Sequence, residues 1–171
     1  VGSKMSPMDI TLQSIMVEMD NVQRTRNIVN GKRNAEAQGK FANQRPYGYD
    51  KDENNRLVLH EEEEPAVRRI FELAKQGYKI SYINKVLIQE GFKRTNGKDW
   101  RYSNIRSILL NPIYMGKHVR KSKEDDTYYL LSDYEFPAYI SEQEFNEIRE
   151  NVRGKATSKE KRNYSKRSEE H

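Results

Sequence analysis

The sequence predicts a mainly α-helical protein: a long N-terminal helix, then a compact helical domain with a helix-turn-helix-like unit and a small β-hairpin. Three observations support this fold class. The chain opens with a long stretch without proline after position 7, whose apolar residues recur at helical spacing. Four later segments repeat that spacing between helix-start and helix-stop residues. Residues 113–136 instead carry two short apolar and aromatic runs on either side of a charged turn, which is typical of a hairpin.

The first helix is expected within residues 1–38. Ser6 can cap its free N–H groups, and Pro7 is tolerated in a first turn. Gly39 is the first expected stop, which gives about 30 residues and a length of ~45–50 Å. The first half carries an apolar stripe from Leu12 to Val22, whereas the second half is polar and basic. We therefore expect this helix to meet a partner through its first half.

Three further segments follow the helix. Residues 39–49 are expected to form an extended connector, since Pro46 disfavours helix at the residue before it. The compact domain is expected over residues 50–152. Residues 153–171 are basic and almost free of apolar side chains, which predicts a disordered tail.

Within the compact domain, the expected helices start at serine or acidic residues and stop at glycine or Asn-Pro. They run from Pro65 to Gly77, from Ser81 to Gly91, from Ser103 to Asn111 and from Ser141 to Val152. A short strand is expected at 57–59, and the hairpin strands at 113–115 and 127–131. The single tryptophan, Trp100, is expected in the core, as are Phe71 and Tyr114.

Composition excludes several classes of function. The chain has no cysteine, which excludes disulfides, thiolate catalysis and the usual zinc fingers, and its 3 histidines are far apart. The acidic run at 61–64 fits a helix start better than acid–base chemistry. We therefore expect no catalytic residue, no cofactor and no metal. No apolar stretch is long enough to span a membrane, so a cytoplasmic protein without membrane partners is expected.

Charge is segregated along the chain, although the net charge is only +5. Residues 24–47 hold many basic residues and a single acidic one, and residues 93–106 follow the same pattern. By contrast, residues 50–64 are acidic. Such segregation fits a polyanion-binding face.

Two groups of residues are candidates for contacts with DNA. One lies on the end of the long helix and the connector, where a basic arm can enter a minor groove; the alternative is a charged linker. The other lies on the helix–loop–helix unit 80–110, whose loop exceeds a tight turn and whose alternative is a solvated helical hairpin. The candidates are Arg33, Lys40, Asn43, Arg45, Tyr47, Tyr49, Arg94, Asn96, Lys98, Arg101, Asn104 and Arg106.

Several motifs over residues 39–152 resemble one known pattern when taken in order. They are Gly39-Lys40-Phe41, Arg45-Pro46-Tyr47-Gly48-Tyr49, Val67-x-x-Ile70-Phe71, Gly77-x-x-Ile80-Ser81, Asn96-Gly97-x-x-Trp100 and Asn111-Pro112-x-Tyr114-x-Gly116. This set resembles the "recombinase" domain of large serine recombinases, such as phage integrases and transposon resolvases. One departure is the Asn43-Gln44 pair, where many relatives carry a small residue.

The resemblance implies a role in site-specific DNA recombination. In that family a serine of an upstream catalytic domain attacks DNA, and the long helix would be the end of that domain. This chain would then be a non-catalytic fragment that binds double-stranded DNA at attachment or resolution sites, for integration, excision or inversion. Self-association through the long helix, as a dimer or tetramer of the parent enzyme, is implied, as is a bacterial or phage origin with location at the nucleoid.

An alternative is a non-catalytic nucleic-acid-binding module, or a helical oligomerisation module, of a regulator. A coiled coil would need apolar heptads along the long helix, and this pattern fades after Val22.

Overall fold

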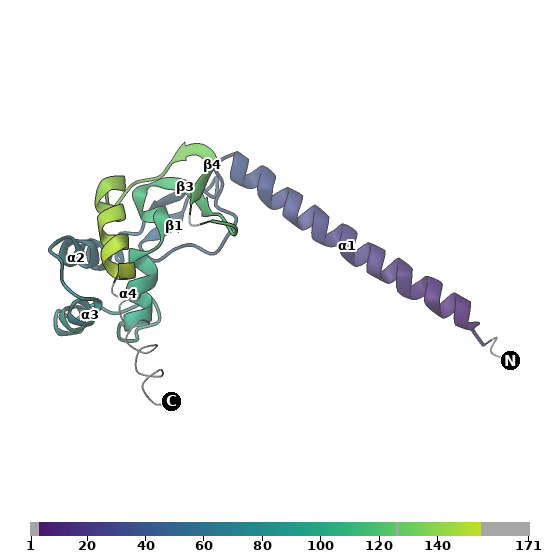
Figure 1. The fold of residues 1–171 in the computed structure, drawn as a ribbon, viewed down its shortest axis with the longest axis horizontal. Coiled ribbons are helices and arrows are strands. Elements are labelled where there is room, and N and C mark those ends of the chain that lie inside the picture. The colour runs from purple at the N-terminus through teal and green to yellow at the C-terminus, as the bar shows by residue number, and fades with distance from the viewer. Residues whose placement is uncertain (1–3, 126, 155–171) are drawn as a thin grey trace, which may run out of the picture.

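The computed structural model describes residues 4–125 and 127–154 (Figure 1). Helix α1 (Pro7–Ala37) projects away from a compact domain that contains all the other elements. In chain order these are β1 (Tyr49–Lys51), β2 (Leu57–Leu59), α2 (Glu64–Lys75), α3 (Ile80–Gln89), α4 (Tyr102–Leu109), the 3-10 helix η1 (Pro112–Met115), β3 (Lys117–Lys121), β4 (Tyr128–Glu135) and a last helix over 142–154.

Helix α1 starts where the sequence predicts. The Ser6 side chain accepts a hydrogen bond from the Asp9 N–H at 3.2 Å, and the Asp9 carboxylate accepts one from the Ser6 N–H at 3.1 Å. This reciprocal cap satisfies two otherwise unpaired donors of the first turn. The expectation of a long N-terminal helix is confirmed.

The last turn of α1 is fastened to the β3–β4 hairpin. Glu36, whose residue surface is only 2% exposed, forms an ion pair with Arg120 of β3. Gly39 ends the helix with φ of +76°, and a Cβ atom there would lie 2.7 Å from Cβ of Tyr134 on β4. A glycine is therefore needed for both the backbone angle and the close approach. The Phe41 N–H then donates to the Asn55 carbonyl at 2.7 Å.

The core of the compact domain lies between the helices and the short β1–β2 pair. α3 packs on both α2 and α4, and Phe145 of the last helix is fully buried. Both β pairs are antiparallel; Tyr49 pairs with Leu59 in the first, and the β3–β4 pair has a register shift between Lys117 and Val119. Trp100, Phe71 and Tyr114 are buried, which confirms the core expected for them. Among the described helices, none is long and apolar enough to cross a membrane.

Two helix starts differ from expectation. α3 begins at Ile80 and α4 at Tyr102, so Ser81 and Ser103 lie inside the first turns and cap neither helix. Ile80, the first residue of α3, and Trp100, two residues before α4, are both buried in the core. α3 and α4 pack together, but residues 90–101 separate them, so a helix-turn-helix is not established.

The hairpin exists, but its first strand is β3 and not residues 113–115. Asn111 accepts a hydrogen bond from the Ile113 N–H at 3.1 Å, Pro112 occupies the first turn, and Gly116 ends it with φ of +78°. These signals favour a helical turn. The consecutive residues Ile113 and Tyr114 are both buried, whereas a strand would turn them to opposite faces.

The last helix follows the expected capping box. Ser141 accepts a hydrogen bond from the Glu144 N–H at 3.3 Å, and Ile140 and Phe145 are both buried beside it. The expected tail lies outside the described residues, except for 153 and 154, which continue this helix.

Candidate nucleic-acid interface

An open groove of about 430 Å³ runs between the connector, the loop before α4 and one face of α4 itself. We call it the connector groove. It brings together five of the expected residues, namely Arg45, Tyr47, Arg94, Asn96 and Asn104. The complete lining is Gln44, Arg45, Pro46, Tyr47, Arg94, Thr95, Asn96, Trp100, Asn104, Ser107, Ile108, Asn111 and Tyr114. Two arginines and several amides and hydroxyls therefore face one groove.

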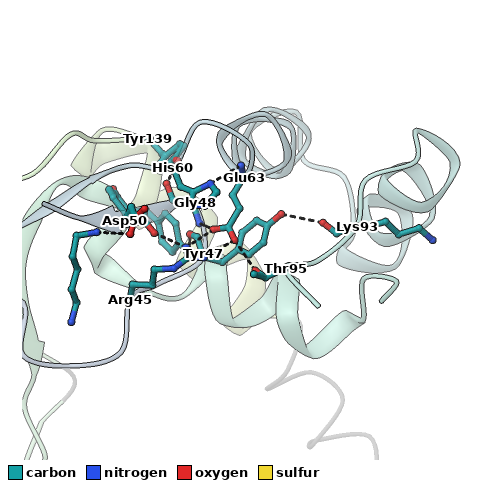
Figure 2. A network of polar contacts seen from close by, with 12 residues as sticks. Arg45, Tyr47, Gly48, Asp50, His60, Glu63, Lys93, Thr95 and Tyr139 are labelled. Carbon is teal, nitrogen blue, oxygen red and sulfur yellow. Dashed lines mark hydrogen bonds and ion pairs between the residues drawn. The ribbon is translucent and has the colours of Figure 1, made fainter. Parts of the chain in front are cut away.

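A buried carboxylate, that of Glu63, organises one side of the connector groove (Figure 2). Its Oε2 accepts hydrogen bonds from Nη1 of Arg45 and from the Gly48 N–H, both at 2.7 Å. Its Oε1 accepts from Nη2 of Arg45 at 3.0 Å and from the Thr95 hydroxyl at 2.6 Å. One side chain at the start of α2 thus ties the connector to the loop before α4.

Glu63 is an anion at neutral pH. Burial by itself raises the pKa of a carboxyl group, but the hydrogen bonds from Arg45, Thr95 and Gly48 outweigh it and lower the pKa of Glu63 to about 2. The same bonds with Glu63 raise the pKa of Arg45. The two residues therefore form an ion pair without net charge.

The turn of the connector requires glycine at position 48. Gly48 has φ of +88°, and a Cβ atom there would lie 2.6 Å from Cγ2 of Val67. Its carbonyl accepts hydrogen bonds from the Tyr139 hydroxyl and, at 3.0 Å, from the His60 N–H. Both polar groups of this peptide are thus satisfied inside the domain.

Tyr47 joins the connector to the loop on the other side of the groove. Its ring packs edge-on against Trp100 with centroids 4.9 Å apart, and its hydroxyl donates to the Lys93 carbonyl at 3.2 Å. The Tyr47 carbonyl accepts from the Tyr114 hydroxyl at 2.6 Å. Burial raises the pKa of Tyr47 to about 12, so its hydroxyl stays protonated.

Tyr49 is a core residue in the structure and has no exposed surface. Its hydroxyl donates to the Pro137 carbonyl at 2.7 Å, and burial raises the pKa of this phenol. The sequence predicts Tyr49 to contact DNA as part of the extended connector. Its place in β1, paired with β2, turns it inward instead.

Asn96 and Asn104 line the groove, and six expected residues besides Tyr49 lie outside its lining. Asn96 accepts a hydrogen bond from the Lys98 N–H at 3.1 Å, which closes the turn before Trp100. Among the described residues Oδ1 of Asn104 has no hydrogen-bond partner, and it is buried, so in this conformation its side chain offers DNA at most the NH₂ group. The residues outside the groove lining are Arg33, Lys40, Asn43, Lys98, Arg101 and Arg106; all are exposed except the half-buried Lys40.

Asn43 links the connector to α1. Its side-chain oxygen accepts a hydrogen bond from Lys32 at 2.6 Å, and its carbonyl accepts one from Lys51 at 2.6 Å. Reasoning from the sequence missed Ser107 and Asn111 as lining residues. Helical spacing relates Ser107 and Asn111 to Asn104. That spacing was the signal that could have found these two.

The fold and the groove define a small, mainly helical domain with a polar groove, attached to a long helix. Residues 61–155 match the Recombinase family, which is more than half of the chain. The chain belongs to this family.

Two solved structures are similar. The crystal structure of an LSR–DNA complex, LSR standing for large serine recombinase, has a TM-score of 0.55 and 25% sequence identity. The match covers 73% of this chain and 38% of that one. A structure from work on the sequence requirements of the Listeria innocua prophage attP site shares the fold, with a TM-score of 0.56 and 24% identity over 73% of this chain and 50% of that one.

The chain therefore spans half or less of the length of these two structures. A search of curated proteins found no match. The resemblance to large serine recombinases that the motifs carry is confirmed.

Proposed function

We propose that this chain is the double-stranded-DNA-binding part of a site-specific serine recombinase. It recognises attachment or resolution sites at which its parent integrates, excises or inverts DNA. The observation that carries this proposal is the connector groove, in which arginine, amide and hydroxyl groups from the connector and α4 converge. Its similarity to a protein solved as an LSR–DNA complex supports the choice of duplex DNA.

The charges around the groove suit a duplex. Lys98, Arg101 and Arg106 are exposed on the loop and helix beside the groove, where they can meet phosphates. Arg94 and the amides inside the groove can reach base edges. The basic half of α1 would cross the duplex, the connector would follow the minor groove, and the compact domain would occupy the next major groove.

The apolar half of α1 suggests self-association as a second property of the parent. Leu12, Ile15, Met16, Met19 and Val22 are exposed along one stretch of α1. A contiguous exposed apolar stripe of this kind marks a protein–protein contact. A dimer or tetramer held by this helix would bring two or more DNA-binding domains to one site.

The reaction itself is assigned to the parent enzyme and not to this chain. No covalent bond to DNA is expected, because in the family the resemblance points to, the serine that attacks the phosphodiester belongs to a catalytic domain and not to the DNA-binding part.

A single titration separates the possible functions. The full chain is mixed with a mixed-sequence duplex, a hairpin RNA and no nucleic acid, over a range of salt concentrations. We expect duplex binding that weakens steeply with salt, and no band of covalent adduct on a denaturing gel. Preference for the RNA would contradict the proposal, and so would a covalent adduct formed by the chain alone. Self-association without any binding would favour the oligomerisation module.

A further inference from the structure

We propose that Glu63 is a positioning residue, which holds Arg45 so that one free edge of its guanidinium faces the DNA and contributes to sequence discrimination. This inference rests on the proposed DNA-binding function. It revises the expectation that Arg45 is simply a basic contact of a flexible arm.

The hydrogen bonds of Arg45 leave one edge free. A guanidinium has five N–H donors in a fixed plane. Nη1 uses both of its donors, one to the Tyr49 carbonyl at 2.6 Å and one to Glu63 at 2.7 Å. Nη2 uses one, to Glu63 at 3.0 Å, and Nε makes no hydrogen bond within the described residues. The remaining donors, on Nε and Nη2, lie on the same edge of the plane.

That free edge has the geometry of a two-pronged donor. Two parallel N–H groups can bind a pair of acceptors, such as N3 of adenine and O2 of thymine, which face the minor groove that the connector would follow. The Arg45 side chain is 28% exposed and lines the connector groove, so the edge is accessible to a partner in the groove. Its guanidinium is already held on the opposite side, so less rotamer freedom is lost on binding.

The Arg45–Glu63 pair has no net charge, which distinguishes its effect on long-range attraction from its effect on sequence recognition. Glu63 neutralises Arg45, so the pair adds little to the long-range attraction of DNA for this face. What it can add is directional hydrogen bonding. A free arginine at the same place would strengthen binding to every duplex alike.

Glu63 also fixes the two sides of the groove relative to each other. The carboxylate that holds Arg45 binds the Gly48 N–H and the Thr95 hydroxyl. Thr95 lies between Arg94 and Asn96, both of which line the groove. The position of Arg45 is thereby coupled to that of the loop.

The test uses the full chain and a duplex that the unaltered chain selects from a random-sequence library, together with a scrambled version of it. For Glu63→Gln we expect discrimination between the two duplexes to fall about tenfold or more, as for loss of one base contact. Affinity for the scrambled duplex is kept or increased, and the salt slope rises by up to about one, because Arg45 is no longer neutralised.

Glu36→Gln is the matched control. It also removes the charge of a buried carboxylate paired with an arginine, but Glu36, in the last turn of α1, and Arg120, on β3, both lie outside the groove lining. It should change the salt slope in the same direction and leave discrimination intact. Thr95→Val keeps the ion pair, so it should reduce discrimination with an unchanged salt slope.

Several outcomes would overturn the inference. One is unchanged discrimination in Glu63→Gln; another is equal loss of affinity for both duplexes, which is what a purely structural role produces. If Glu63→Gln does not fold, Arg45→Lys decides, since it keeps the charge but lacks the two-pronged edge. Retained discrimination in Arg45→Lys would refute the proposal. A chain that selects a sequence but keeps its discrimination in Glu63→Gln refutes the positioning role alone, whereas a chain that binds no duplex, or selects no sequence, refutes the proposed function.

Discussion

Helix α1 and the compact domain place their apolar side chains in opposite ways. The domain buries its large apolar residues between α2, α3, α4 and the last helix, whereas α1 exposes Met16 and Met19 by about two thirds. In the domain the polar groups of the connector also find internal partners, as those of Gly48 do. The comparison teaches that the domain satisfies its apolar and polar groups by its own contacts, while the first half of α1 leaves its apolar side chains exposed in the described part of the chain.

The largest expected effect is the loss of a core aromatic residue. Trp100→Ala should lower the free energy of unfolding by about 3–5 kcal/mol, because Trp100 is buried and packs against Tyr47. Chemical denaturation measures this. Met19→Ala on α1 is the control and should leave stability unchanged. If Trp100→Ala left the free energy of unfolding unchanged but abolished DNA binding, Trp100 would belong to the binding face and not to the core.

The next effect concerns acid stability. A carboxyl group whose pKa falls from 4.5 to about 2 on folding stabilises the folded state above pH 4.5, and this stabilisation disappears as the pH falls toward 2. For Glu63 we expect on the order of 3 kcal/mol over this window.

Chemical denaturation at several pH values measures the free energy of unfolding. Between pH 4.5 and 2 this free energy should depend less on pH for Glu63→Gln than for the unaltered chain. Glu53→Gln, which removes the charge of an exposed carboxylate, is the control. Equal pH profiles for Glu63→Gln and the unaltered chain would show that the carboxylate has no special environment.

A smaller effect is expected at the start of α1. Ser6→Ala removes one half of the capping box and should cost about 1 kcal/mol of local helix stability. Amide hydrogen exchange should become faster in the first turns of α1 and remain unchanged in the compact domain. Faster exchange in the core helices would mean that α1 and the domain unfold together.

The smallest effect on the domain should follow deletion of residues 1–23. This segment contributes no buried residue among those described, so the melting temperature of the domain should stay within error. Sedimentation velocity should show less self-association, because the apolar stripe is gone. Loss of cooperative melting would show instead that the stripe packs within the chain.

The positions of the helices could be predicted from the sequence. Apolar spacing and the stops at Gly77 and Gly91 located the helices, and the long first helix needed only Ser6 and Gly39 as boundaries. These signals are local, and helices depend chiefly on local signals.

Features that depend on distant partners could not be read in the same way. Glu63 is one of four consecutive acidic residues, and only its neighbourhood with Arg45, 18 positions away, distinguishes it from the others. Tyr49 is expected from the sequence to contact DNA as part of the extended connector, but pairing of β1 with β2 turns it inward. The roles of the remaining residues in DNA binding stay predictions.

The central claim is that the connector groove and the loop before α4 form the DNA-binding face. Hydrogen exchange of the full chain, with and without the selected duplex, tests it most directly, since binding slows exchange where backbone amides become covered. We predict slower exchange over residues 40–47 and 94–107. Protection confined to the hairpin at 117–123, with unchanged exchange in the connector and α4, would contradict the account.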